Sequence, residues 1–533
     1  MADDARVVGV YPPQTIETHA RLLGALSCAL PVSFHGFSEG LNCDAVVSFA
    51  GDDSLAVIDA QDRWCFVSQA SGQRAEHLGI VFSSNEAIEP VLRGRAFEPE
   101  PNIDLDDIKP SQADRVLAKS DRGPFWIRRE TDGIAVDVTA AVIPELSPDE
   151  VLRDRLSPGR CMATLPVFHF LRDLTREIDW RPPPLRACFI IDDPNLHTMS
   201  YGFIRFQTLA KHAATHNYHI SSAMIPLDGW YVNGRAAQFF RDHADRLSLL
   251  VHGNNHSTHE LAQAYSESDG IALAAQALRR IARFESRSGL SVARVMVAPH
   301  GKWAAPVAAA MSRVGFDAMC HSRPFPWIKR LSADVPLAGM APAQWNEEGL
   351  PALPRFSLEA NETDVVLRAF LGHPVIMLGH HWDAVNDYGL FEQASNIVNS
   401  LGEVRWMNME AMALSNYAWK REGNVLRVRA YSKQLSIEIP SGVEAVEVEA
   451  PVLGGEFACN KLDVSGVEPK HRRENGVIRS APVRVSGDNC PVRWCHARPV
   501  DPAALRGPAT SWRHIARRLA TEVRDRCQPL TGR

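Results

Sequence analysis

The sequence predicts an α/β protein whose central segment is a parallel β-sheet, open or closed into a barrel. The first observation is that short apolar runs alternate with stretches of helical spacing from residue 187 to residue 401. The second is that three consecutive prolines, Pro182 to Pro184, separate this segment from the chain before it. The third is the length of 533 residues, which at about 150 residues per domain indicates about three to four domains.

The expected elements of the central domain follow the hydrophobic pattern. Strands are expected at residues 187–191, 219–225, 247–251, 293–298 and 375–379, and helices at residues 201–216, 234–245, 271–286, 304–314 and 390–401. Because strands and helices alternate, neighbouring strands are expected to run parallel with a helix in each crossover. We place this domain at residues 180–414.

The flanking segments predict two further domains. Residues 1–179 indicate an α/β domain of flavodoxin-like or amidotransferase-like type, with residues 98–110 as a surface loop. A class I glutamine amidotransferase needs a cysteine on a sharp turn, and neither Cys28 nor Cys43 lies on one. This domain is therefore expected to be non-catalytic and to recognise substrate or mediate assembly. Residues 415–533 predict a β-sandwich, for glycan binding or an interface, with a terminal helix.

Composition excludes several classes of protein. The 57 basic and 63 acidic side chains give a net charge of −6, which argues against a nucleic-acid-binding protein. The ten cysteines form no C-x-x-C pair, which argues against a disulfide scaffold or a thiolate zinc site. We see no signal peptide, and no apolar run approaches the ~20 residues of a transmembrane segment. A cytoplasmic protein is expected, with peripheral membrane contact and oligomeric state left open.

Four of the expected strands end in carboxylates or imidazoles. These residues are Asp192 and Asp193, His252 and His256, His300, and His380 and His381. In parallel α/β folds the carboxyl ends of the strands meet at one face, where ligands bind. The sequence therefore predicts that these side chains converge on one site.

One carboxylate and two imidazoles with an open position suit a catalytic divalent metal such as zinc. A second carboxylate beside the first can act as a general base on the attacking water, and a further imidazole can protonate the leaving group. Taken alone, Asp192 and Asp193 are equally typical of a turn or a helix cap. The two histidines at the equivalent end of another strand favour the metal site.

A second histidine triplet has the same spacing. His212, His216 and His219 repeat the four-then-three separation of His252, His256 and His259. The triplet His212, His216 and His219 spans the end of a helix and the start of a strand, so it is expected near the amino ends of the strands, with a structural or solvent-facing role. His259 is a weaker candidate than His252 and His256, as a supporting residue or a helix cap.

Residues 187–381 resemble the polysaccharide deacetylase family, also called the NodB-homology or carbohydrate esterase family. The family's T-F-D-D motif has Phe189-Ile190-Ile191-Asp192-Asp193 in its place, and its H-[ST]-x-x-H motif corresponds to His252-Gly253-Asn254-Asn255-His256. The resemblance implies a distorted (β/α) barrel and a divalent metal, most often Zn²⁺. It also implies that Asp192 is the catalytic base and that Asp193, His252 and His256 are the metal ligands.

The chain departs from the family pattern in three places. Gly253 replaces the usual hydroxyl residue, which removes a hydrogen bond that stabilises the loop. Val297 replaces the arginine that orients the base, so orientation would depend on Arg294 or Lys302. Pro326-Trp327 is one candidate for the tryptophan motif, although a loop aromatic that packs on the barrel explains it better.

The remaining site residues are assigned by their position next to these motifs. The backbone N–H of His300 is expected to stabilise an oxyanion. The run Ile376 to His381 matches the late motif, with His380 favoured as the general acid and His381 as the second candidate. Substrate contacts are expected from Asn195, His197, Asn255 and Trp303, with a helix cap as the alternative for Asn195.

These observations lead to the hypothesis that the protein is a metal-dependent hydrolase. It would remove an acyl group, with N-acetyl as the favoured group, from a sugar or glycan precursor. By family analogy its partners would be an acylated sugar, a nucleotide-sugar or a lipid-linked glycan, as in surface polysaccharide, O-antigen or lipopolysaccharide assembly. The altered third motif motivates an alternative, a hydrolase of another C–N bond such as a formamide or sugar amide. A third hypothesis is a non-catalytic glycan-binding protein.

Overall fold

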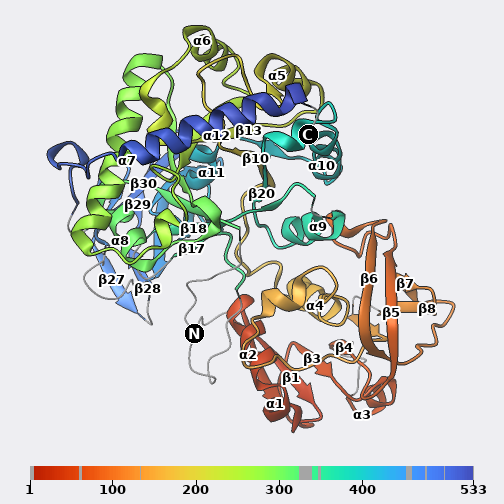
Figure 1. Cartoon of the computed structure of the whole chain (residues 1–533). Helices are drawn as coiled ribbons and strands as arrows, with labels where there is room; N and C mark the ends of the chain where they lie inside the picture. Colours follow the sequence, from red (N-terminus) through yellow and green to blue (C-terminus); the bar gives the residue numbers. More distant parts are fainter. Residues whose placement is uncertain are drawn as a thin grey trace. The chain divides into compact units, whose positions relative to one another are not determined.

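The computed structural model describes residues 5–58, 63–131, 134–322, 339–345, 350–359, 361–451, 459–474, 477–496 and 499–531. The chain forms two compact units (Figure 1). The first comprises Met1–Trp180, Lys329–Met340 and Asn361–Leu371, and the second comprises Arg181–Ile328, Ala341–Ala360 and Gly372–Arg533. The first division falls directly before the run of three prolines.

The first unit is built on one nine-stranded mixed sheet in the order β2-β1-β3-β4-β9-β8-β7-β5-β6. Its strands are β1 (Arg6–Tyr11), β2 (Val32–Gly36), β3 (Ala45–Ser48), β4 (Trp64–Val67), β5 (Gln73–Phe82), β6 (Ala96–Leu105), β7 (Arg115–Ser120), β8 (Gly123–Thr131) and β9 (Ile134–Thr139). Its helices are α1 (Thr15–Thr18), α2 (Ala20–Ala29), α3 (Leu55–Ile58), α4 (Leu165–Thr175) and α9 (Glu362–Phe370). The predicted α/β character is confirmed, but the expected loop at residues 98–110 is wrong over its first part, which belongs to β6.

The second unit contains a sheet of eight parallel strands in the order β18-β16-β15-β14-β13-β10-β20-β19. They are β10 (Arg186–Asp192), β13 (Ile220–Met224), β14 (Leu247–His252), β15 (Val292–Val297), β16 (Ala318–His321), β18 (Pro351–Pro354), β19 (Phe356–Ser357) and β20 (Val375–Gly379). The short β17 (Gln344–Trp345) and β21 (Arg405–Trp406) pair with β18 and β10, and β11 (Ser200–Tyr201) pairs with β12 (Ile204–Arg205). The predicted parallel sheet is confirmed.

One residue closes this sheet into a barrel. The edge strands β18 and β19 are consecutive in the chain and are separated only by Arg355. Because β18 pairs with β16 and β19 pairs with β20, this short segment joins the two ends of the sheet. The predicted distorted (β/α) barrel is therefore confirmed. The surrounding helices are α5 (Phe206–Thr215), α6 (Gly234–Asp242), α7 (Glu267–Ser288), α8 (Ala305–Val314), α10 (Gly389–Asn399) and α11 (Met409–Leu414).

The alternation of side chains along the barrel strands decides what faces the interior. Cys188 and Ile190 of β10 belong to one buried apolar cluster with Leu353 of β18. Phe189 faces the other way and packs on Phe391 of α10. Asp192 continues the inward-facing series of β10, and Arg355 continues that of β18. The alternation therefore places the carboxylate of Asp192 and the guanidinium group of Arg355 at the same end of the barrel interior.

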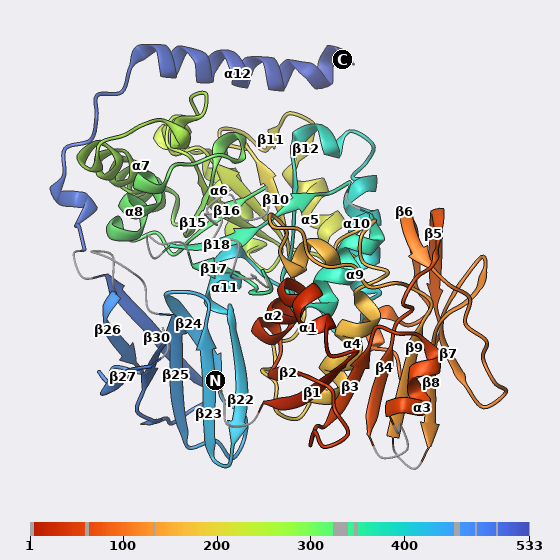
Figure 2. The same ribbon diagram turned by 90° about the horizontal axis from the view of Figure 1, so that it is seen from below.

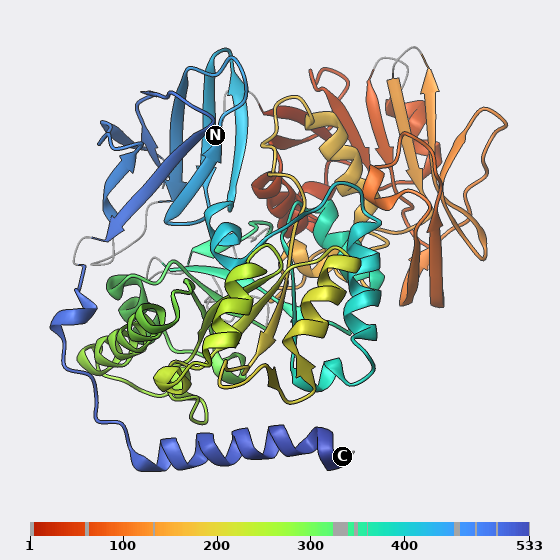
Figure 3. The same ribbon diagram turned by 90° about the horizontal axis from the view of Figure 1, so that it is seen from above.

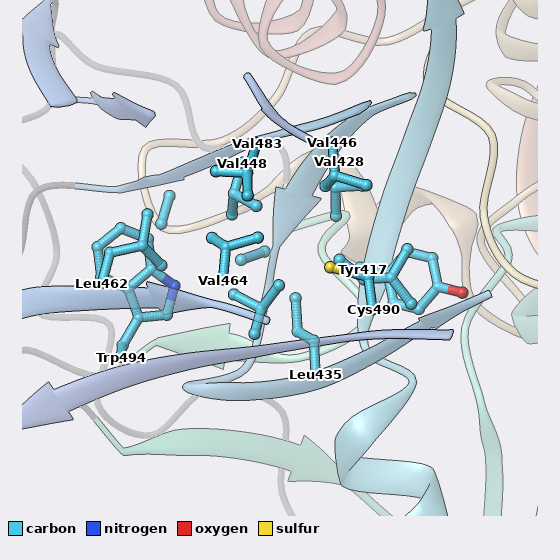
Figure 4. Close-up of a cluster of buried hydrophobic side chains, with 14 of the residues drawn as sticks. Tyr417, Val428, Leu435, Val446, Val448, Leu462, Val464, Val483, Cys490 and Trp494 are labelled. Atoms are coloured by element: carbon cyan, nitrogen blue, oxygen red, sulfur yellow. The ribbon is translucent and has the colours of Figure 1, made fainter. Parts of the chain in front are cut away.

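The C-terminal part of the second unit is a β-sandwich. One sheet contains β22 (Tyr417–Glu422), β23 (Val425–Ala430), β25 (Ala445–Pro451), β27 (His471–Glu474), β28 (Val477–Ser480) and β29 (Val483–Arg484); the other contains β24 (Gln434–Glu438), β26 (Cys459–Val464) and β30 (Asn489–His496). Side chains from both sheets, such as Val446 and Leu435, meet in one buried core (Figure 4). This confirms the predicted sandwich, which is followed by helix α12 (Trp512–Thr531). Among the described residues, no helix is long and apolar enough to cross a membrane.

A buried histidine makes the first unit sensitive to acid. His169 of α4 is buried, packs against Trp126, and accepts a hydrogen bond from the Glu89 backbone N–H at 3.1 Å. Burial lowers the pKa of His169 from 6.5 to about 3. Below pH 6.5 the unfolded chain therefore binds a proton that the folded unit does not bind.

We accordingly expect the stability of this unit to fall between pH 6.5 and pH 3, by up to about 1.4 kcal/mol for each pH unit. The variant His169→Gln keeps an acceptor but does not titrate, so its urea midpoint is expected to change less between pH 7 and pH 4.5. Equal shifts in the two proteins would show that His169 is not the group responsible.

Candidate metal centre

Three predicted metal ligands lie together at the carboxyl end of the barrel. The Nε2 atoms of His256 and His252 lie 3.4 Å and 3.8 Å from Oδ1 of Asp193, and all three ligand atoms lie within 4.8 Å of one another. Oδ1 of Asp193 is buried and accepts no hydrogen bond from the described residues. A buried carboxylate oxygen left beside two imidazole nitrogens fits a divalent cation. This donor set suits zinc, among other metals.

The backbone and neighbouring groups direct these side chains. Asp193 follows β10 with a positive φ of 81°, and His256 has a φ of 54°; such values are uncommon for residues other than glycine and occur often at functional sites. Nδ1 of His252 lies 3.1 Å from the carbonyl oxygen of Val297, which fixes the tautomer and leaves Nε2 free to bind a metal. Burial and His252 lower the pKa of His256 to about 3, so its ring is neutral near pH 7.

The loop that carries these histidines is held by Glu260, a residue that the sequence reasoning did not identify. The carboxylate of this buried residue accepts hydrogen bonds from the backbone N–H groups of Asn254, Asn255 and His256 at 2.8–3.1 Å. This arrangement replaces the hydroxyl that Gly253 lacks. The signal in the sequence was only an acid four residues after His256.

The geometry also explains why Gly253 cannot carry a side chain. Its φ is 60°, and a Cβ atom there would lie 2.6 Å from Cγ of Pro299 and 2.8 Å from Oε2 of Glu260. We expect Gly253→Ser, which restores the family's usual residue type, to lower the free energy of unfolding by about 1–3 kcal/mol. It should also lower metal affinity. Gly234→Ser is the control because no atom lies near its Cβ position. A Gly253→Ser protein with unchanged stability and metal affinity would contradict this account of the loop.

Asp192, the predicted base, forms a buried bidentate pair with Arg355. The two guanidinium nitrogens of Arg355 donate to Oδ1 and Oδ2 of Asp192 at 2.7 Å and 2.8 Å, and both residues are 4% exposed. Burial alone would raise the pKa of Asp192, but Arg355, His252 and His380 hold that pKa well below its usual range. The carboxylate is therefore ionised and fixed in orientation.

Arg355 takes the orienting position for which Arg294 and Lys302 were considered. Arg294 pairs with Glu285 at 2.7 Å, and Lys302 is exposed. In this structure the arginine that pairs with Asp192 is Arg355 and neither of these two. Arg355 comes from the strand junction that closes the barrel, which no motif marked.

The two histidines after β20 have different surroundings. His380 is the residue after Gly379, which pairs in register with Ile191, so it lies beside Asp192 and contributes to its low pKa. Its ring is stacked on the half-exposed Trp382 at 4.3 Å. His381 is buried and is stacked on Phe203 at 5.9 Å. Of the two predicted acids, His380 is thus the one placed beside the base.

Among the other predicted residues, the ring of His300 lies near the candidate ligand His256. The ring of His300 is exposed and 5.3 Å from that of His256, and the exposed ring of His259 is 5.4 Å from His300. Trp303 is half-buried in the loop after β15. Pro326 and Trp327 lie outside the described residues.

No family model and no curated protein matches this sequence. Among solved structures, the carbohydrate deacetylase Agd3 aligns over 92% of this chain and 98% of its own, with a TM-score of 0.50 and 10% sequence identity. The chain has a carbohydrate deacetylase fold. A family 4 carbohydrate esterase from Streptomyces lividans (TM-score 0.26, 12% identity, 42% of this chain, 91% of its own) was also found. A further match is a polysaccharide deacetylase, described as putative, from Mycobacterium smegmatis. Its TM-score is 0.30 and its sequence identity 14%, over 44% of this chain and 92% of its own.

Helix α12 covers part of the carboxyl end of this deacetylase fold and binds two of the predicted substrate residues. Arg526 donates to Oδ1 of Asn195 at 3.0 Å, and Glu522 lies 3.0 Å from Nδ1 of His197. Asn195 is 2% exposed and His197 is half-buried. In this structure both side chains are engaged by α12 and not open to solvent.

Asn255, another predicted substrate residue, is also engaged by arginines of neighbouring helices. Its side-chain oxygen accepts from Arg280 at 2.9 Å, and its backbone carbonyl accepts from Arg517 of α12 at 3.4 Å. Asn255 is 7% exposed. Direct substrate contact by Asn195, His197 and Asn255 stays a prediction.

The second histidine triplet is separate from this site. Nδ1 and Nε2 of His219 lie 3.0 Å and 2.8 Å from Asp245 O and Ser248 Oγ, so this ring is a satisfied core residue. His212 and His216, at the end of α5, form a second cluster with Glu392 of α10. Both lie away from the carboxyl ends of the strands, as predicted.

Proposed function

We propose that the chain is a metal-dependent hydrolase that removes an acyl group, namely N-acetyl, from a sugar or glycan. The observation that carries this proposal is the buried Oδ1 of Asp193, which faces two imidazoles within a deacetylase fold. Beside it lies an ionised carboxylate, Asp192, held by Arg355. A metal-binding triad next to a fixed base is an arrangement that supports metal-assisted amide hydrolysis.

The three ligands Asp193, His252 and His256 would hold the divalent ion, for which we propose Zn²⁺. A bound ion would supply Lewis-acid polarisation of the acyl carbonyl. Asp192 would accept the proton of the attacking water at a carboxylate oxygen. Arg355 keeps that carboxylate in one orientation, so the base needs no reorganisation when the water arrives.

His380 is the residue proposed to return a proton to the departing nitrogen or oxygen. It lies beside Asp192, and its ring is only half-buried, so it can reach substrate. His381 is enclosed by Tyr201 and Phe203 and is therefore proposed to support the site and not to touch substrate. The His300 N–H remains our proposal for the group that stabilises the oxyanion.

The test is product analysis with metal control. Protein stripped by a chelator and reloaded with Zn²⁺, Co²⁺ or Mn²⁺ would be assayed for acetate, formate and ammonia. The panel contains acetylated oligosaccharides, nucleotide-sugars and lipid-linked sugars, the classes among which we place the substrate. We expect acetate, and only after reloading. Formate or ammonia without acetate would favour cleavage of another C–N bond, and absence of all products from every reloaded form would favour a binding protein.

A further inference from the structure

The inward face of α12 is attached to the barrel by charged groups. Arg518 forms a buried bidentate pair with Asp228, with nitrogen–oxygen distances of 2.7 Å and 3.3 Å. Asp525, also buried, accepts a hydrogen bond from the Tyr201 hydroxyl at 2.8 Å. With the contacts to Asn195 and His197 described above, these groups fix which side of the helix faces the barrel.

The outward face of α12 carries an apolar stripe. Trp512, Ile515, Leu519 and Val523 are 72%, 45%, 47% and 61% exposed. Their spacing of three, four and four residues places them on one side of the helix. An amphipathic helix of a globular protein ordinarily buries such a stripe against its core. Here the charged contacts hold the neighbouring side of the helix against the barrel, and the four apolar side chains remain exposed.

The charges beside the stripe are basic. Arg513 is exposed, and Arg524, whose side chain is 64% exposed, forms an ion pair with Asp525 at 2.7 Å. The helix has two carboxylates, and both are engaged on the inward side: Glu522 by His197 and Asp525 by Tyr201. The described outward face of α12 thus presents apolar groups and arginines without an exposed carboxylate. Figures 2 and 3 show α12 as the outermost element along its side of the second unit.

We propose that the outward face of α12 docks on an anionic lipid surface, with the helix lying in the plane of the interface. The apolar stripe would enter the boundary between headgroups and acyl chains, and Arg513 would meet a lipid phosphate. A second copy of the chain is the less favourable occupant. Two such faces packed together would offer no exposed carboxylate to Arg513. The proposal stands on α12 alone and does not depend on the proposed reaction.

The test is co-sedimentation of the full-length protein with vesicles of phosphatidylcholine, with or without 30% phosphatidylglycerol, a typical anionic mixture. We expect binding to the anionic vesicles that weakens as salt rises. The variant Leu519→Glu/Val523→Glu, which changes exposed side chains only, is expected to bind at least about tenfold more weakly. Arg513→Gln should weaken binding about fivefold. Val81→Glu, at a 52% exposed apolar residue of the first unit, is the matched control and should bind like the wild type.

Three results would overturn the proposal. One is that the wild type does not bind anionic vesicles. Another is that it binds neutral and anionic vesicles equally. The third is a concentration-dependent dimer in light scattering that disappears in Leu519→Glu/Val523→Glu, because the face would then serve a second copy of the chain. Circular dichroism of each variant establishes that it is folded before its binding is interpreted.

Discussion

Replacing Asp192 with asparagine is expected to lower kcat by about 10²–10⁴-fold while the protein keeps its metal. Asparagine has nearly the same shape but cannot accept the proton of the attacking water. The proposed metal ligands Asp193, His252 and His256 are unchanged, so metal content should stay at the wild-type level. The measurement is kcat for acetate release, with metal content determined on the same preparation by mass spectrometry.

A second buried ion pair provides the control for this variant. Asp137 pairs with Arg128 in the first unit at 2.6 Å, and both residues are buried. Asp137→Asn therefore carries a comparable stability cost in a part of the chain without a proposed catalytic role. If Asp192→Asn retained kcat within a few-fold of the wild type, or lost no more than Asp137→Asn, Asp192 would not be the base.

Replacing Arg355 with methionine is expected to reduce both stability and activity. Asp192 would remain buried without its partner, and such a loss costs about 3–5 kcal/mol of unfolding free energy. Because the base would also lose its fixed orientation, kcat should fall by about 10²-fold in the protein that remains folded. The measurements are urea unfolding and acetate release at a temperature where the variant is folded.

The variant Arg355→Lys separates orientation from charge. Lysine restores a positive charge but cannot form the bidentate pair, so we expect it to recover much of the stability and only part of kcat. Full recovery of kcat by lysine would show that charge alone, and not the geometry of the guanidinium group, supports Asp192. An unchanged kcat in Arg355→Met would remove Arg355 from the site.

The sequence carried enough information to bring the candidate metal ligands together. The proposed ligands Asp193, His252 and His256 lie at the ends of β10 and β14 or within four residues of them, and short loops leave little freedom in where such side chains point. Parallel pairing then brings the strand ends together, whatever the rest of the chain does. The same logic placed His380 beside Asp192.

The sequence could not show the partners that arrive from far along the chain. Arg355 and Asp192 are 163 residues apart, and Arg355 sits between two strands so short that they gave no periodic signal. Residues 98–110 looked like a loop because of their prolines and acids. Part of that segment is nevertheless an edge strand, β6, where a proline can be accommodated. Tertiary pairing overrode local propensity there.

The predicted substrate residues illustrate the same limit. Asn195 and His197 stand just beyond the aspartates and have the polarity of groups that contact a sugar. In the structure they bind Arg526 and Glu522, more than 300 residues later. A polar side chain near a strand end can be satisfied by a ligand or by a distant helix, and hydrogen-bonding capacity alone does not distinguish the two.

The central claim is that Asp193, His252 and His256 hold one divalent metal ion that the reaction needs. Its most direct test is the metal content of the purified protein by inductively coupled plasma mass spectrometry. We predict one divalent ion per chain at the catalytic centre, lost together with acetate release in Asp193→Ala and retained in His212→Ala, which alters the second histidine cluster. Metal content and activity that survive Asp193→Ala, or that are lost in His212→Ala, would contradict the assignment.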